Sequence, residues 1–418
     1  MTFLAMANAS LRDVALTMRN LSLRERWWTI GFGICMLGIV FSQAIFSIML
    51  YGLSLMATFE LLISKPPGIR KSSFLLLVFP WLFVLCIPLL QNIYLSTNSP
   101  DIRQYKLYML LLPFLGLRLS IMSAQAKKML VDLTLMLCCI NGLIITGHLA
   151  VSWADWGHKI EQGHHLWVPN GQPKATAILM ATISIVGVNT LFRFPNKSFF
   201  RKIAITLLVI VIHFMTVRIA WLMVYLGVGG SLFLHLIHQK RWKTVAGGTL
   251  LLISLPIMMY YTIPSLASRV NYTIYDWASW KSNDTPNTSD ALRFTSWDIG
   301  WKAMQTNPAI GVGTLAMEEV INEKYTKHYP EIAQENRIRP HNQFLYIGLE
   351  LGIVGCICCI VAMLCLLVYF YHVPSIILWA LFFLYCFIDC PLNRQVILAI
   401  FWFGLVLSAS HSKESHAS

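Results

Sequence analysis

A short polar segment followed by a long apolar one carries the first residues that could do chemistry. The stretch RIRPHNQFLYIGLELGIVG, residues 337–355, places Arg339, His341 and Asn342 directly before a hydrophobic run. A histidine can take a proton from a hydroxyl group because its pKa lies near neutral pH, and a neighbouring guanidinium or amide can orient a substrate. The same residues can instead cap a membrane helix, with Pro340 at its start. The local sequence leaves both interpretations open.

Two arginines lie where a guanidinium could hold an anion. Arg218 interrupts the apolar run HFMTVRIAWLMVYLG, at the joint between two predicted spans. A charge at this depth is costly and usually faces a cavity or a partner, although a snorkelling arginine in a tight hairpin would also fit. Arg293 lies in SDALRFTSWDIGWKAM, on the first turns of a predicted helix. Its planar fork suits phosphate oxygens, and a plain surface position is the alternative.

Three further basic residues lie beside predicted membrane helices. Arg103 and Lys106 belong to STNSPDIRQYKLY, and Lys174 belongs to VPNGQPKATAIL. Anchoring at the membrane interface is the simpler interpretation of all three, and support of a binding site is the other.

Motifs for several other kinds of chemistry are missing. The sequence has no HExxH, no GxSxG and no Walker loop, and its predicted outer segments hold no DxD-like carboxylate pair. Gly311 and Gly313 form a lone GxG, which we interpret as a turn that ends the preceding helix. We expect no metal site and no cofactor, so a reaction on phosphate would rely on arginines instead of a divalent ion.

The composition indicates that these residues belong to an integral membrane protein. The chain has 418 residues, of which 56% are hydrophobic and 12% charged. At roughly 20 apolar residues per span, the apolar runs predict about 12 transmembrane helices and an all-α integral membrane protein. The predicted spans are 27–43, 46–63, 73–92, 106–122, 129–149, 174–192, 203–216, 219–237, 244–263, 342–370, 374–388 and 395–410.

The positive charge of the chain predicts its orientation. Net charge is +13, from 32 Lys and Arg against 19 Asp and Glu. If the N-terminus is cytoplasmic, most basic residues outside the long loop fall on the cytoplasmic side, as the positive-inside rule requires. Topology therefore explains the charge, and because no nucleic-acid-binding motif accompanies it, we expect no nucleic acid partner.

One long polar segment, residues 264–340, separates two groups of spans. Its aromatic content predicts an ordered, mostly helical subdomain on the outer side, not a slack connection. We therefore divide the chain into three parts. Residues 1–263 contain an N-terminal cytoplasmic tail and transmembrane helices 1–9, and residues 264–340 form the outer loop. Residues 341–418 contain transmembrane helices 10–12 and a second cytoplasmic tail.

Taken together, these features resemble the O-antigen ligase and polymerase superfamily. Residues 216–218 match an (S/T)xR step before a helix, and 291–293 resemble an ARL-like arginine in the order A-L-R. Residues 341–355 meet the pattern HNxxLxxxxxxGxxG. The segment NSPDIRQYKLY also resembles the short outer loop of lipopolysaccharide ligases.

The resemblance implies a GT-C-like fold and a function. The chain would transfer a glycan from undecaprenyl diphosphate to lipid A-core at the periplasmic face of the bacterial inner membrane, with inversion and without a metal. His341 matches the family's proposed base, and Arg218 and Arg293 match arginines proposed to hold the donor diphosphate. We expect supporting roles for nearby polar residues, namely Asn342, Arg339, Arg103, Lys106 and Lys174.

Other functions remain as alternatives. An O-antigen or related polysaccharide polymerase would use the same lipid-linked donor, and a protein O-glycosylating ligase would differ in its acceptor. A transporter should place charges along a path across several spans. The predicted spans and their ends hold few such residues, Asp132, His213, Glu350 and Asp389, which disfavours transport.

Overall fold

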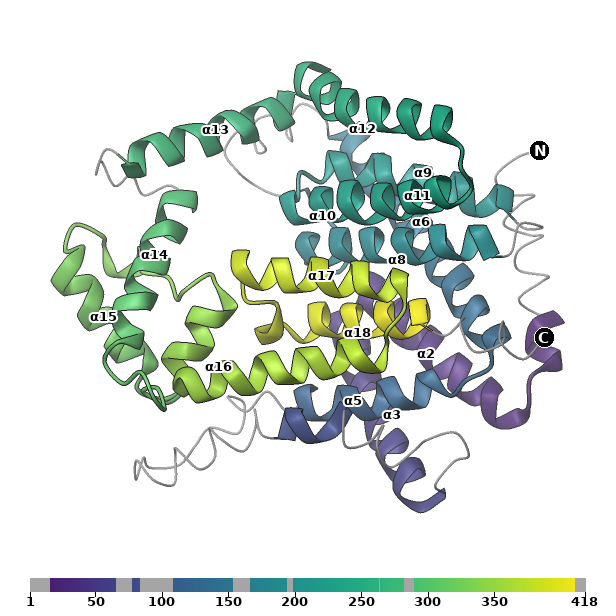
Figure 1. Cartoon of the computed structure of the whole chain (residues 1–418), viewed down its shortest axis with the longest axis horizontal. Helices are drawn as coiled ribbons and strands as arrows, with labels where there is room; N and C mark the ends of the chain where they lie inside the picture. Colours follow the sequence, from purple (N-terminus) through teal and green to yellow (C-terminus); the bar gives the residue numbers. More distant parts are fainter. Residues whose placement is uncertain are drawn as a thin grey trace.

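Every element of the computed structural model is helical within the residues it describes. These residues are 16–64, 77–82, 108–152, 166–193, 198–262, 264–281 and 289–409. Most of the helices lie side by side in one bundle (Figure 1). In chain order the bundle contains α2 (Leu23–Phe41), α3 (Gln43–Ser64), α5 (Tyr108–Ser120), α6 (Ala124–Val151), α8 (Pro173–Arg193), α9 (Ser198–Phe214), α10 (Arg218–Leu222), the π-helix η3 (Met223–Gly229), α11 (Gly230–His238), α12 (Trp242–Thr262), α16 (Gln343–Tyr369), α17 (Val373–Ile388) and α18 (Gln395–Ala409).

Several helices of the bundle are long and apolar enough for a membrane protein. Within the described ranges, six stretches are long and apolar enough to cross a membrane: Gln43–Leu61, Ala124–Val151, Pro173–Phe192, Arg218–His238, Trp242–Thr262 and Gln343–Tyr369. Three shorter apolar helices, α5, α17 and α18, accompany them. The predicted all-α membrane class is therefore confirmed. Each predicted span overlaps a helix, except that 73–92 lies mostly outside the described residues, and the count of about 12 stays a prediction.

Helix α8 is the central element of the bundle and contacts α6, α9, α18 and η3. Close packing against it depends on small residues in its neighbours. A Cβ on Gly227 of η3 would lie 2.3 Å from Ile185, and one on Gly404 of α18 would lie 2.5 Å from Thr182. Such close approach stabilises helix pairs where lipid removes the hydrophobic driving force. Lys174 lies in the first turn of this helix.

Three further helices lie beyond one end of the bundle, at the left of Figure 1. They are α13 (Pro264–Lys281), α14 (Ser289–Met304) and α15 (Met317–His328), followed by the 3₁₀ turn Gln334–Asn336. Ile299 of α14, Ile321 and Tyr325 of α15 and Leu349 of α16 share a second buried cluster. This cluster fixes α14 against the start of α16.

Helix α16 is broken at Gly352, whose φ of 66° and ψ of −167° lie in a region that only glycine tolerates. The segment 308–313 supplies the missing backbone partners. Ile353 donates to the Pro308 carbonyl at 2.9 Å, and Val312 and Gly313 donate to carbonyls of residues 349 and 350 at 2.9 and 3.0 Å. Helix α14 already ends at Met304. The interpretation of Gly311 and Gly313 as the end of that helix was therefore wrong, because these glycines instead allow the chain to approach the break in α16.

Candidate active site

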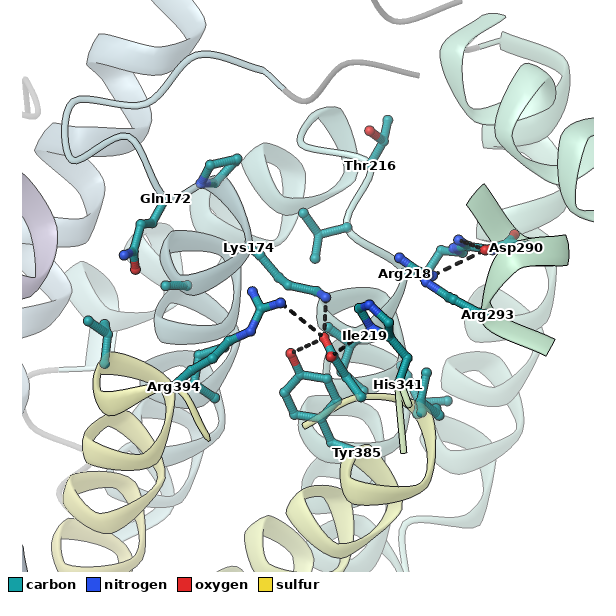
Figure 2. Close-up of a pocket in the computed structure, with 18 of the residues that line it drawn as sticks. Gln172, Lys174, Thr216, Arg218, Ile219, Asp290, Arg293, His341, Tyr385 and Arg394 are labelled. Carbon is teal, nitrogen blue, oxygen red and sulfur yellow. Dashed lines mark hydrogen bonds and ion pairs between the residues drawn. The ribbon is translucent and has the colours of Figure 1, made fainter. Parts of the chain in front are cut away.

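The polar residues at this end of the bundle surround one large cavity of about 1110 Å³ (Figure 2). Its wall comes from the starts of α8, α10, α14 and α18, the end of α17 and the turn before α16. Four of the residues predicted from the sequence line it, namely Lys174, Arg218, Arg293 and His341. Segments far apart in the sequence therefore meet at one site.

His341 is positioned by α14. Its backbone N–H donates to Ser296 Oγ at 3.3 Å, and its carbonyl accepts from Trp297 Nε1 at 2.8 Å. Gly300 allows this approach, since a Cβ there would lie 2.7 Å from Pro340. Asn342 caps α16, because its Oδ1 accepts from the N–H groups of Phe344 and Leu345 at 3.0 and 3.1 Å. Asn342 thus fixes the backbone beside the histidine and does not line the cavity.

Asp389 orients the imidazole ring of His341. The His341 Nδ1 lies 3.1 Å from Asp389 Oδ1, and the side chain of Asp389 is only 4% exposed. Burial alone raises the pKa of this carboxyl, but the hydrogen bond from His341 and the charges of Lys174 and Arg394 outweigh it, so the pKa lies far below its usual range. An ionised carboxylate only accepts hydrogen bonds, so Nδ1 carries the hydrogen. Nε2 of neutral His341 is left with a lone pair, as a general base requires.

The other oxygen of Asp389 collects the remaining polar groups on this side. Lys174 Nζ forms an ion pair with Oδ2, and the Tyr385 hydroxyl donates to it at 3.3 Å. Arg394 lies near it, with an N···O distance of 3.9 Å. Lys174 is thus held at the site by a buried carboxylate, which is more than an interfacial anchor needs.

Arg218 and Arg293 meet at a second carboxylate, that of Asp290. Arg218 donates to both oxygens of Asp290, at 2.5 and 2.7 Å, and to the Thr273 hydroxyl at 3.0 Å. Arg293 NH1 donates to Asp290 at 3.1 Å. A second acid, Asp276, accepts from the Asp290 N–H at 3.2 Å and lies close enough to act on Arg218. Two carboxylates thus balance the two guanidinium groups, whose planar donors suit the oxygens of an anionic ligand.

The turn before Arg218 is strained. Thr216 has φ of 54°, in the left-handed region that β-branched residues rarely adopt. It lines the cavity, as do Val217 and Arg218, and connects α9 to α10. Strain at such a position persists only where the surroundings impose it, and it often accompanies function. The turn at the (S/T)xR step therefore places Arg218 at the wall of the cavity.

The remaining predicted residues are placed elsewhere. Arg339 pairs with Glu318 at 2.9 Å, its side chain is 53% exposed, and it does not line the cavity. Arg103 and Lys106 lie outside the described residues. In the part of the chain that the structure describes, no group of three or more His, Cys, Asp or Glu is arranged to hold a metal ion.

Sequence reasoning missed the two acids that organise the site. Asp290 was not singled out as a site residue, and Asp389 was considered only as a charge in or at the end of a predicted span. A lone carboxylate between two apolar helices is costly unless it is paired, which is the signal that could have identified Asp389.

The fold and the site define a polytopic helical membrane protein with a histidine, a buried aspartate and clustered arginines in one cavity at an end of the bundle. Residues 203–360 match the family model described as O-Antigen ligase, which confirms the resemblance to this superfamily. The match contains Arg218, Arg293 and His341, whereas Lys174 and Asp389 lie outside it. No curated protein matches the chain significantly. The family indicates ligase- or polymerase-type glycan transfer in general, with lipid-linked polysaccharide substrates.

Proposed function

We propose that the protein is an O-antigen ligase that moves a glycan from undecaprenyl diphosphate to lipid A-core. The observation that carries this proposal is the shared cavity, in which a base and two arginines face the same space within a ligase-family domain. The proposal places the cavity and residues 264–340 on the periplasmic side of the bacterial inner membrane, in a GT-C-like fold.

The proposed reaction is a single inverting displacement. An acceptor hydroxyl attacks the anomeric carbon of the donor, its proton passes to His341 Nε2, and the bond from the anomeric carbon to the phosphate oxygen breaks. Asp389 stabilises the imidazolium that forms, since its carboxylate lies 3.1 Å from Nδ1. Carrier-linked diphosphate leaves with the bonding electrons.

Arg218 and Arg293 stabilise the charge on the leaving diphosphate. Both form ion pairs with the carboxylate of Asp290, which accepts from their donors. A diphosphate would share or replace that carboxylate and satisfy the same guanidinium groups. The apolar wall next to Arg218, formed by Ile219 and Leu222, suits the start of a lipid chain.

The first experiment measures transfer by the purified full chain, with lipid-linked glycan as donor and core oligosaccharide as acceptor. His341→Ala should lower the rate about 100- to 10,000-fold, the usual contribution of a general base. His328→Ala is the matched control, because His328 is exposed on α15 and does not line the cavity. Equal rates for the two variants at matched expression would contradict the role of His341, and absence of transfer by the wild type would favour a transporter.

A second experiment separates ligase from polymerase, which share the donor and differ in the acceptor. Deletion of the gene is followed by gel analysis of extracted lipopolysaccharide and of lipid-linked glycan. Loss of a ligase leaves core without any O-chain while lipid-linked polymer accumulates. Core that bears a single repeat would instead identify a polymerase.

A further inference from the structure

Arg394 differs from the other cationic residues that line the cavity. Lys174, Arg218 and Arg293 are each hydrogen-bonded to a carboxylate. The Arg394 guanidinium lies 3.9 Å from Asp389 Oδ2, which is too long for a hydrogen bond. Within the described part of the chain it forms no side-chain hydrogen bond, and it is 46% exposed. Its planar set of donors is therefore available to a ligand.

The backbone beneath this side chain is firmly held. The turn Pro391–Asn393 precedes Arg394, and Leu392 within it is fully buried. The Leu392 N–H donates to Gln343 Oε1 at 2.9 Å, and its carbonyl accepts from the Tyr108 hydroxyl at 2.9 Å. A rigid base that carries a guanidinium with a long ion pair and no side-chain hydrogen bond is suited to binding, because little backbone freedom is lost when a ligand arrives.

The position of Arg394 separates it from the proposed donor site. In Figure 2 the pair Arg218 and Arg293 lies on one side of His341, and Arg394 lies on the other. Around Asp389, the charges of Lys174 and Arg394 exceed the one carboxylate, so this side has a positive excess. A second anionic group would balance it.

The start of α18 adds to this preference. Gln395, the first residue of α18, lines the cavity beside Arg394. Peptide N–H groups at a helix start carry partial positive charge and favour anions within the first turn. The Arg394 guanidinium, which makes no side-chain hydrogen bond to the described residues, remains the main observation, and the helix start only supports it.

We propose that Arg394 binds an anionic group, a phosphate or a carboxylate, carried by the acceptor glycan, and so orients the attacking hydroxyl toward His341. This inference rests on the proposed glycosyl transfer and adds a charge requirement for the acceptor. The donor diphosphate is the other possible source of the anion, and the experiment is arranged to separate the two.

The test compares initial transfer rates of the full-length wild type, Arg394→Gln and Arg394→Lys while donor and acceptor are varied separately. Loss of a charge-assisted bidentate contact should raise the acceptor KM roughly 10- to 100-fold in Arg394→Gln. The donor KM should stay unchanged, and Arg394→Lys should recover part of the loss. Acceptor stripped of phosphate and with its carboxylates esterified should reduce the wild type to the level of Arg394→Gln and leave that variant nearly unaffected. Arg241→Gln is the control, because Arg241 is exposed and does not line the cavity.

Several outcomes would overturn the proposal. An unchanged acceptor KM in Arg394→Gln, with normal wild-type transfer, would make Arg394 a surface arginine and leave the proposed function intact. A raised donor KM alone would assign Arg394 to the diphosphate. If the wild type transfers nothing, direct binding of the untreated acceptor is measured without donor. Equal affinity of wild type and Arg394→Gln in that titration would also refute the role.

Discussion

Replacement of Asp389 by asparagine tests the histidine–aspartate pair with the smallest possible change in shape. In the wild type, Asp389 Oδ1 accepts from His341 Nδ1 at 3.1 Å and from the Cys390 N–H at 2.8 Å. Oδ2 faces the ammonium of Lys174 and the hydroxyl of Tyr385. An amide keeps one acceptor and replaces the other by a donor, so one of these two sets must lose its partner.

The magnitude depends on how the amide turns. If its oxygen faces His341 and Cys390, the correct tautomer survives, but the forming imidazolium loses its counter-charge. A hydrogen bond to a charged group contributes about 1.5–3 kcal/mol, which corresponds to roughly a 10- to 150-fold lower rate. If the NH₂ group faces His341, Nδ1 must accept and Nε2 carries the hydrogen. The base is then blocked, and losses of about 10⁴-fold are known for this error in serine proteases.

The assay is the transfer rate at saturating substrates for wild type and Asp389→Asn, with thermal melting as a folding control. Asp298→Asn is a matched comparison, because Asp298 forms a similar pair with Lys302 at 2.5 Å but does not line the cavity. A variant Asp389→Asn that folds and keeps more than half of the wild-type rate would refute the reasoning. A loss equal to that of Asp298→Asn would do the same.

Four other changes give distinct expectations. Arg218→Lys and Arg293→Lys each keep the charge but lose the planar fork, so each should slow transfer, and the double variant should be little slower than the slower single variant. Initial rates near the wild-type value in both single variants would mean that these arginines only anchor the helices. Asp290→Asn removes a carboxylate that competes with the donor diphosphate, so the donor KM should fall, and it also removes the group that aligns the two arginines, so kcat should fall as well. Steady-state kinetics with an unchanged donor KM and an unchanged kcat would exclude both effects. Transfer should persist in EDTA, and a loss that magnesium or manganese restores would disprove metal independence. Gly352→Ala should destabilise the fold by about 1–3 kcal/mol, because residue 352 has a backbone conformation that alanine rarely adopts. Gly248→Ala is the control and should raise or preserve the melting temperature, because the space around Gly248 is open. Equal melting temperatures of the two variants would contradict the interpretation of the broken helix.

Local sequence was sufficient to predict the apolar helices and four of the residues that line the cavity, namely Lys174, Arg218, Arg293 and His341. Apolar runs of span length identify helices because each must bury or shield its backbone in lipid. Arg218 was recognisable because a guanidinium in such a run is costly unless it has a partner. His341 was recognisable because it lies directly before a long apolar helix and beside other polar residues, where an imidazole could act as a base.

The partners of these residues could not be read from local sequence. Asp290 and Arg218 are separated by 72 residues, and His341 and Asp389 by 48. The first pair meets only because the start of α14 lies beside the start of α10, and the second because the end of α17 lies beside the turn before α16. The same limit explains Arg339, whose ion pair with Glu318 forms only when α15 folds beside the segment that precedes α16. Sequence patterns identify groups that need a partner, and tertiary structure determines which partner they find.

The two acids, Asp290 and Asp389, have the same role on the two sides of the cavity. Asp290 neutralises part of the charge of Arg218 and Arg293, and Asp389 does the same for Lys174. Without these carboxylates, the four cations that line the cavity, Lys174, Arg218, Arg293 and Arg394, would repel one another at the edge of an apolar bundle. The pairing also sets a threshold for ligands. An anion must offer more than the bidentate carboxylate of Asp290 to take over its arginines, and a diphosphate, with several oxygens and more than one negative charge, meets that condition better than a single carboxylate does.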